Sequence, residues 1–130
     1  MIGKLAIVTP AKNEAKNIPR LVENMAAQTK RPDLWIFIND GSTDSTVDVF
    51  NEEIKKHSTA FKNTQIQLVN YEDEEKSYAL GPKYSRIIKF GLNSIFEQEA
   101  DKKFEFVGIL DSDVFPEKAY YEVLLDKFKN

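Results

Sequence analysis

The sequence of 130 residues contains no cysteine and only one histidine, His57. Disulfide bonds and thiolate metal ligands are therefore excluded, and a zinc site of the usual kind is not expected. No apolar run approaches the roughly 20 residues that span a bilayer, and the first residues show no secretory signal. The lack of an apolar span and of a signal predicts a cytoplasmic protein, or a domain at the cytoplasmic face of a membrane, associated with that membrane only through regions beyond these residues; the lack of cysteine leaves the redox compartment open.

The net charge and the length of the chain further restrict its possible partners and its domain organisation. The formal net charge of −3 disfavours the phosphate backbone of a nucleic acid as partner. The length is typical of one domain that buries a core without covalent cross-links. Short apolar runs predict strands over residues 4–9, 34–38, 65–71 and 104–110, and the first, second and fourth of these are expected to be buried. Amphipathic segments predict helices over residues 18–26, 43–57, 81–95 and 117–127.

The order of these elements predicts the fold. Strictly alternating strands and helices indicate a parallel sheet with helices on both faces, a three-layer α/β/α fold of Rossmann-like type. The third strand is the least apolar, which suits an edge position and favours the strand order 3-2-1-4. A ligand is then expected outside the carboxyl ends of the strands, between the first and the fourth. Gly91 lies on the apolar stripe of the third helix, which predicts a close approach to the sheet.

Two carboxylates follow the fourth strand. If the extended geometry persists, Asp111 and Asp113 lie on the same side of it, because side chains alternate along a strand. A hydrated divalent cation relieves the repulsion between such a pair, and oxygen ligands suit Mg²⁺ or Mn²⁺. The alternative is that both are solvated loop acids that cap a helix starting near Pro116.

Other polar segments also follow predicted strands, at residues 9–14 and 39–44, and a further one precedes Gly81. Each has an ordinary explanation. Residues 41–43 suit a tight turn with a helix cap from Ser42 or Thr43, and Glu14 suits the first turn of a helix. Together, however, they gather acids at one edge of the sheet without nearby bases. Such acids suit a sugar nucleotide, whose base and ribose donate hydrogen bonds and whose diphosphate binds a cation.

Residues 6–14, 17–21, 28–29, 39–46 and 110–113 together resemble family 2 glycosyltransferases of the GT-A fold. The order and spacing of these segments match across nearly the whole chain. The Asp-Gly-Ser-Thr-Asp and Asp-x-Asp segments are weak signals alone, but their distances from Pro10, Asn13 and Glu14 make the combination specific.

The resemblance implies a role for each matching residue. It implies a nucleotide-sugar site formed by Thr9, Pro10 and Ala11 along the base, Glu14 at the base or ribose, Asp40 and Gly41 at the base edge, and Asp111 and Ser112 near the ribose. Asp113, with Asp111, would hold Mn²⁺ or Mg²⁺ against the diphosphate. Lys83 and Arg86 would supply basic contacts. The implied reaction is an inverting, metal-dependent transfer of a sugar, with a UDP-sugar as donor and an unknown acceptor.

Three departures from the family pattern qualify this implication. Asn39 replaces the first acid of a usual pair, and Ala11 replaces a common aromatic or basic residue. The sequence also ends at Asn130, before the family's acceptor site and general base. Residues 1–130 are therefore expected to be the nucleotide-sugar-binding domain of a longer chain, inactive by itself, with the general base beyond Asn130.

Other functions stay open. A non-catalytic sugar-nucleotide-binding or interaction module would keep the fold without the chemistry. A receiver-like signalling domain needs an aspartate at the end of the third strand, where this chain has Asn70 and Tyr71. A nucleotidyltransferase usually has a glycine-rich loop after the first strand, and residues 10–14 contain no glycine.

Overall fold

The computed structural model describes residues 4–72, 80–98 and 104–128, so most of the acidic loop expected over residues 71–77 and of the polar segment over residues 97–103 lies outside the described residues. The elements in chain order are β1 (Leu5–Ala11), α1 (Ile18–Ala26), β2 (Leu34–Asn39), α2 (Thr46–Lys56), β3 (Gln65–Asn70), α3 (Leu80–Gln98), β4 (Phe106–Ile109) and α4 (Tyr120–Phe128).

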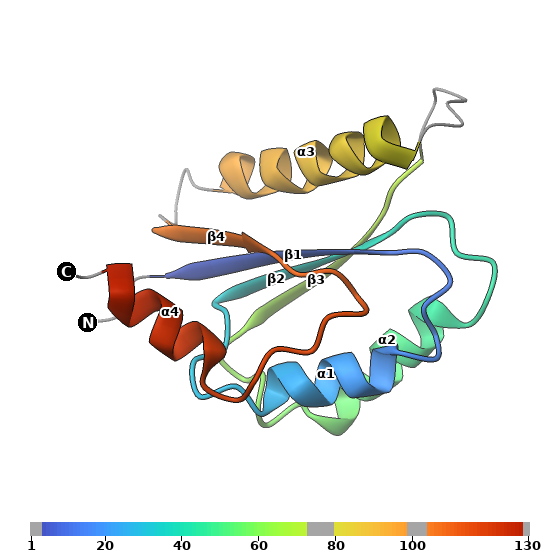
Figure 1. The fold of residues 1–130 in the computed structure, drawn as a ribbon. Coiled ribbons are helices and arrows are strands. Elements are labelled where there is room, and N and C mark those ends of the chain that lie inside the picture. The colour runs from blue at the N-terminus through green and yellow to red at the C-terminus, as the bar shows by residue number, and fades with distance from the viewer. Residues whose placement is uncertain (1–3, 73–79, 99–103, 129–130) are drawn as a thin grey trace.

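The sheet confirms the predicted topology. Its strands are all parallel and lie in the order β3-β2-β1-β4. Figure 1 shows α3 over one face of the sheet and α1, α2 and α4 on the other side, which makes the expected three layers. β3 is only half-buried along its length, as expected of an edge strand.

The central strands supply the core on both faces. Every residue of β2 is buried, because the strand is covered from both sides. Toward α3 the core includes Val8, Ile38 and Ile95. On the other face the ring of Phe50 from α2 stacks on Phe37 with centroids 4.0 Å apart. These apolar contacts, rather than helix propensity, hold the helices on the sheet.

The end of β1 differs from the prediction, which stopped the strand at Pro10. β1 continues to Ala11, and Pro10 stands in register with Ile38 of β2. The pairing of β1 with β4 reaches only to Val8, whose carbonyl accepts from the N–H of Leu110 at 2.9 Å. The backbone N–H and C=O groups of alternate residues in a strand face opposite neighbouring strands. The nitrogen of Pro10 therefore faces the β4 side, as the carbonyl of Val8 does. Because β4 no longer pairs with β1 there, the missing N–H of proline costs no hydrogen bond of the sheet.

β4 is not buried as predicted. Val107 and Ile109 are 37% and 47% exposed, and they share a face with Ala6 and Val8, their partners in β1. α3 packs over β1 and β2 and does not extend over β4, which lies at the edge of the sheet. The apolar character of the strand therefore does not indicate burial here.

Helices α2 and α4 begin about three residues later than predicted. α2 begins at Thr46 with Ser45 at the N-cap position, so neither Ser42 nor Thr43 caps it. α4 begins at Tyr120, well beyond Asp113, which excludes the explanation that the paired acids cap this helix.

The spacing of Tyr120, Val123, Leu124 and Phe128 predicts that these residues form the buried face of α4, and this prediction is wrong. Tyr121 and Leu125 are buried, whereas Tyr120, Val123 and Phe128 are exposed. Gln28, which is fully buried after α1, accounts for this orientation: its Nε2 donates to the carbonyl of Glu117 at 2.6 Å, and its Oε1 accepts from the N–H of Tyr121 at 3.4 Å. These bonds fix the start of α4 against α1, so the face carrying Tyr121 meets the core.

Gly91 confirms the predicted close approach of α3 to the sheet. A Cβ atom at this position would lie 2.6 Å from Cγ1 of Val8 and 2.8 Å from Cδ1 of Ile38. Val8 is buried and has one rotatable side-chain bond, so it cannot move aside easily.

We therefore expect Gly91→Ala to lower the free energy of unfolding by about 1–2 kcal/mol, because overpacking outweighs the gain of about 1 kcal/mol in helix propensity. Urea denaturation followed by circular dichroism measures this change. Asn93→Ala, at an exposed position of the same helix, is the control and should be neutral or slightly stabilising. A Gly91→Ala protein as stable as the Asn93→Ala protein would contradict the close approach.

Candidate nucleotide-sugar site

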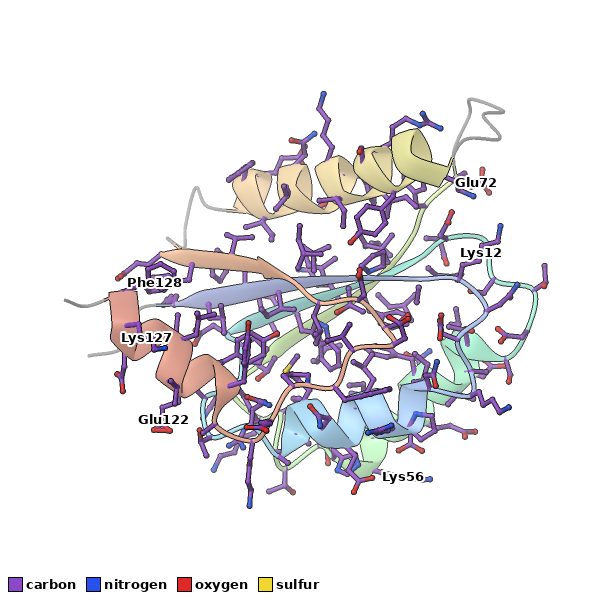
Figure 2. The ribbon with its side chains drawn as sticks, viewed as in Figure 1. Lys12, Lys56, Glu72, Glu122, Lys127 and Phe128 are labelled. Atoms are coloured by element: carbon purple, nitrogen blue, oxygen red, sulfur yellow. The ribbon has the colours of Figure 1, made fainter. Side chains whose placement is uncertain are left out.

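The polar segments after β1, β2 and β4 meet at one edge of the sheet. Lys12, directly after β1, and Glu72, shortly after β3, mark this edge in Figure 2, whereas Phe128 lies at the opposite end of the molecule. A cleft of about 240 Å³ opens here, lined by Pro10, Ala11, Lys12, Glu14, Asp40, Tyr84, Ile87, Asp111, Ser112 and Asp113. We call it the acidic cleft, since four of these side chains are carboxylates. It lies between β1 and β4, the predicted switch point of the sheet.

The loops after β1 and β2 are joined through Asn13. Its Oδ1 accepts from the N–H of Thr43 at 2.7 Å and from the N–H of Asp44 at 3.2 Å. Its own N–H donates to Oγ of Ser42 at 3.0 Å. Asn13 adopts a φ of +53°, a left-handed conformation that asparagine tolerates better than most residues. The side chain thus holds two loops that are 30 residues apart in the sequence.

Further bonds strengthen the same corner. The N–H of Glu14 donates to Oγ1 of Thr46 at 2.9 Å, and the Thr46 hydroxyl in turn donates to Asp44. That hydroxyl lowers the pKa of the Asp44 carboxyl below its ordinary value, so Asp44 is ionised at neutral pH. Glu14 precedes α1 and is not in its first turn as the simpler explanation required. Most of the Asp-Gly-Ser-Thr-Asp segment therefore builds the loops and does not reach the cleft.

Asn39 has a structural role that an aspartate could not fill. Its Nδ2 donates to Oδ1 of Asn70 at 2.9 Å, and its Oδ1 accepts from the N–H of Ser42 at 3.1 Å. A carboxylate has no donor for the first of these bonds. The bonds steady the end of β2, from which Asp40 projects into the acidic cleft. Gly41 follows with a φ of +62° and makes the turn.

Helix α3 contacts two of the four acids that line the cleft, Asp40 and Asp111. Nζ of Lys83 lies 3.3 Å from Oδ2 of Asp40, whose side chain is only 12% exposed. The hydroxyl of the next residue, Tyr84, donates to Oδ1 of Asp111 at 2.7 Å. Partial burial, with this bond and the nearby carboxylates, raises the pKa of Tyr84 to about 12, so the phenol keeps its proton.

The paired acids do not share a side through strand alternation. β4 ends at Ile109, and the N–H of Val114 donates to the carbonyl of Asp111 at 3.1 Å, which closes a turn. Asp111 and Asp113 nevertheless both line the acidic cleft. The turn, together with the buried Ser112, brings them there instead of the extended geometry that the spacing suggested.

Four of the residues implied by the resemblance do not line the cleft. The side chain of Thr9 is fully buried, and its Oγ1 accepts from Nε1 of Trp35 at 2.9 Å, so it points into the core. Gly41 forms the turn beside Asp40. Arg86 lies half-buried on α3, away from the cleft lining, and Lys83 meets Asp40 at its margin. The remaining implied residues do line it, namely Pro10, Ala11, Glu14, Asp40, Asp111, Ser112 and Asp113.

The cleft is suited to a cation that is bound partly by the protein and partly by a substrate. Over the described ranges, no group of three or more histidine, cysteine, aspartate or glutamate side chains forms a complete metal cage. Mg²⁺ is commonly bound through only one or two carboxylates plus substrate phosphates and waters, and oxygen ligands suit Mn²⁺ as well. Asp111 and Asp113 therefore fit the metal as a partial ligand set.

No site contact was predicted for Lys12, Tyr84 and Ile87, which line the cleft, or for Asn13, which holds its loops. Tyr84 looked like a core position, because it falls on the apolar stripe of α3, yet it is 43% exposed. Asn13 was recognised as part of a motif but was assigned no contact. In both cases the partner comes from a distant loop, which local spacing does not reveal.

The fold is that of GT-A glycosyltransferases, as solved structures show. S. aureus TarS superposes with a TM-score of 0.69 at 19% identity, over 97% of this chain and 19% of TarS. The mannosyltransferase PcManGT from Pyrobaculum calidifontis, in complex with GDP-Man and Mn²⁺, has a TM-score of 0.59 at 20% identity, over 99% of this chain and 32% of its own. Glucosyl-3-phosphoglycerate synthase from Mycobacterium tuberculosis, with Mn²⁺, UDP and phosphoglyceric acid, has a TM-score of 0.55 at 16% identity, over 97% and 39%.

Residues 6–130 match the family described as Glycosyl transferase family 2, and the chain belongs to that family. No curated protein matches the sequence. The chain spans between 19% and 39% of the solved structures named above. In the part of the chain that the structure describes, no helix has the length and apolarity needed to cross a membrane.

Asn13 provides a test of the loop corner. We expect Asn13→Gly, which keeps the left-handed backbone accessible, to lower the free energy of unfolding by about 1 kcal/mol through the lost hydrogen bonds. Asn13→Ala should lower it by about a further 1 kcal/mol, because alanine disfavours a positive φ. Urea denaturation measures both, with Lys12→Ala at the exposed neighbouring position as a neutral control. Equal stability of the glycine and alanine variants would show that the backbone conformation is unimportant.

Proposed function

We propose that this chain is the donor-binding part of a glycosyltransferase that moves a sugar from a nucleoside-diphosphate sugar to an acceptor. The observation that supports this most directly is the acidic cleft, in which carboxylates from three separate loops converge at the switch point of a GT-A fold. A cleft without a cluster of bases suits a ligand that offers hydrogen-bond donors and brings its own cation.

Each part of the cleft has a proposed role. Pro10 and Ala11 line the nucleotide base, and Asp40 accepts a hydrogen bond from the edge of that base. Asp40 is held by Lys83 through Oδ2, which leaves Oδ1 for the base. Oε2 of Glu14 accepts a hydrogen bond from Nδ2 of Asn17 at 2.6 Å. Its other carboxylate oxygen, Oε1, is left to bind the base or the ribose. We keep no role for the side chain of Thr9, which is buried.

Asp111 and Asp113 would hold a divalent cation beside the diphosphate. When bound, the cation neutralises negative charge on the departing nucleoside diphosphate. The aspartates themselves orient the diphosphate end of the donor, and Asp111, which lines the same cleft, is also proposed to meet the ribose. Mn²⁺ is the ion in the PcManGT and glucosyl-3-phosphoglycerate synthase structures, and Mn²⁺ or Mg²⁺ is the proposal here.

UDP-sugars are the proposed donors. TarS has been solved with UDP and with UDP-GlcNAc, whereas PcManGT carries GDP-Man, so the fold accommodates more than one base. We also propose an inverting transfer, which requires a general base on the acceptor hydroxyl. Because this chain spans a minor part of the similar solved structures, we propose that the base and the acceptor site belong to a longer protein. A cytoplasmic location stays a prediction from the sequence.

Asp113 tests the function. We expect UDP with Mn²⁺ to bind the chain in calorimetric titration, and Asp113→Ala to weaken that binding by about tenfold or more, since loss of a ligand to a bound cation costs on the order of 1.4 kcal/mol or more. Asp126→Ala, at an exposed position of α4, removes the same charge far from the cleft and should have no effect. Equal binding by both variants would refute the metal-ligand role.

A further test separates catalysis from binding alone. Sugar transfer to small acceptors, measured by release of UDP from UDP-sugars, should stay near background for this chain because the proposed general base lies outside it. Efficient transfer by residues 1–130 would show that the base is already present. A module that binds UDP without any transfer in its full-length protein would support the non-catalytic alternative.

A further inference from the structure

Tyr84 stands in an unusual place for an aromatic residue on the apolar stripe of a helix. It is 43% exposed, and its ring belongs to neither of the two buried clusters that hold α3 and the other helices on the sheet. Its hydroxyl instead crosses from α3 to the turn after β4, where it donates to Oδ1 of Asp111 at 2.7 Å. The most specific contact of this side chain is therefore made inside the acidic cleft.

The turn after β4 has other anchors and does not depend on this bond. The N–H of Leu110 donates to the carbonyl of Val8, the N–H of Val114 closes the turn on Asp111, and Ser112 is buried. These contacts fix the backbone but leave the Asp111 carboxylate free to rotate about its side-chain bonds. The bond from Tyr84 restricts that rotation, because a hydrogen bond to an ionised acceptor is short and directional.

A carboxylate has two oxygens and about four acceptor positions, so one bond does not exhaust it. With Oδ1 of Asp111 engaged by Tyr84, Oδ2 is left for a ligand. Lys83 engages Asp40 in the same manner, through Oδ2 alone. Two consecutive residues of α3 thus each hold one oxygen of an acid from a different loop, and each acid keeps a second oxygen for the ligand.

We propose that Tyr84 is a positioning residue of the donor site, which orients Asp111 through Oδ1 so that Oδ2 meets the donor and its cation. This inference rests on the proposed function, since it specifies how one of the proposed donor ligands is held. Tyr84 acts through Asp111 and does not itself take part in sugar transfer. The phenol limits the conformations of the carboxylate before the ligand arrives, which reduces the entropy lost on binding.

The test removes only the hydroxyl. In calorimetric titration of residues 1–130 with UDP and Mn²⁺, we expect Tyr84→Phe to weaken binding about three- to tenfold, the range for a lost hydrogen bond to a charged group at a partly exposed site. Titration with UDP in EDTA, without free cation, should show a smaller loss, because only the contact of Asp111 with the ribose is affected and the base contacts are intact. Tyr120→Phe, at an exposed position of α4, is the matched control and should bind like the wild type.

A double-mutant cycle identifies the partner. In an Asp111→Ala background, Tyr84→Phe should have no further effect on binding of UDP with Mn²⁺, because the group that it positions is gone. The melting temperatures of the wild type and Tyr84→Phe should agree, since the phenol is not part of the core. A lower melting temperature that accounts for the weaker binding would instead indicate a structural role and overturn the proposal.

The remaining outcomes separate this inference from the function on which it rests. If Tyr84→Phe binds UDP with Mn²⁺ as the wild type does, while Asp113→Ala is impaired, the positioning role is wrong and the donor site stands. An equal loss with and without the cation would mean that Tyr84 contacts the nucleotide directly, and it would also overturn the proposal. If the wild type binds no UDP in the presence of Mn²⁺, the proposed function and this inference fail together.

Discussion

The structure depends on the point at which β1 and β4 part. Their pairing stops at Val8, while β1 continues beside β2 to Ala11. Beyond that point β4 turns away through Asp111, and the space between the two strands becomes the acidic cleft. When a strand extends beyond one of its neighbours, its backbone groups on that side have no partner in the sheet. Proline at position 10 has no N–H, so it removes the one backbone donor that would have faced this gap. The same geometry that ends the ladder therefore prepares the site.

The helix α3 links the stability of the sheet to the arrangement of the cleft. Gly91 lets the helix lie directly on Val8 and Ile38. One end of the same rigid element carries Lys83 and Tyr84, which reach the acids after β2 and β4. Because a helix is rigid, tight packing at Gly91 also helps to fix the positions of Lys83 and Tyr84 on the same helix. The contacts of the core and those of the site are therefore not independent.

Residues of one motif divide between structure and proposed function. Among residues 39–46, Asp40 lines the cleft, while Asn39, Ser42, Thr43, Asp44 and Thr46 bond to neighbouring segments. In the segment after β1, Asn13 holds the corner and Glu14 lines the cleft. The polar character of such segments thus has two causes. Loops that position acids must satisfy their own backbone groups, and short polar side chains do so without occupying the cleft.

The number, type and order of the elements, the parallel sheet with β3 at an edge, and the loops that carry the acids could all be predicted from the sequence. These properties follow from local periodicity and from the chirality of crossovers, which require no knowledge of distant contacts. Which side chains enter the cleft could not be predicted in this way, because it depends on contacts between distant segments. Thr9 turns into the core toward Trp35, α4 presents Tyr121 and leaves Tyr120 exposed because Gln28 fixes its start, and Tyr84 leaves the apolar stripe to meet Asp111. Each of these outcomes is set by a partner from a distant segment, and pairings between distant residues are not encoded in the spacing of either one.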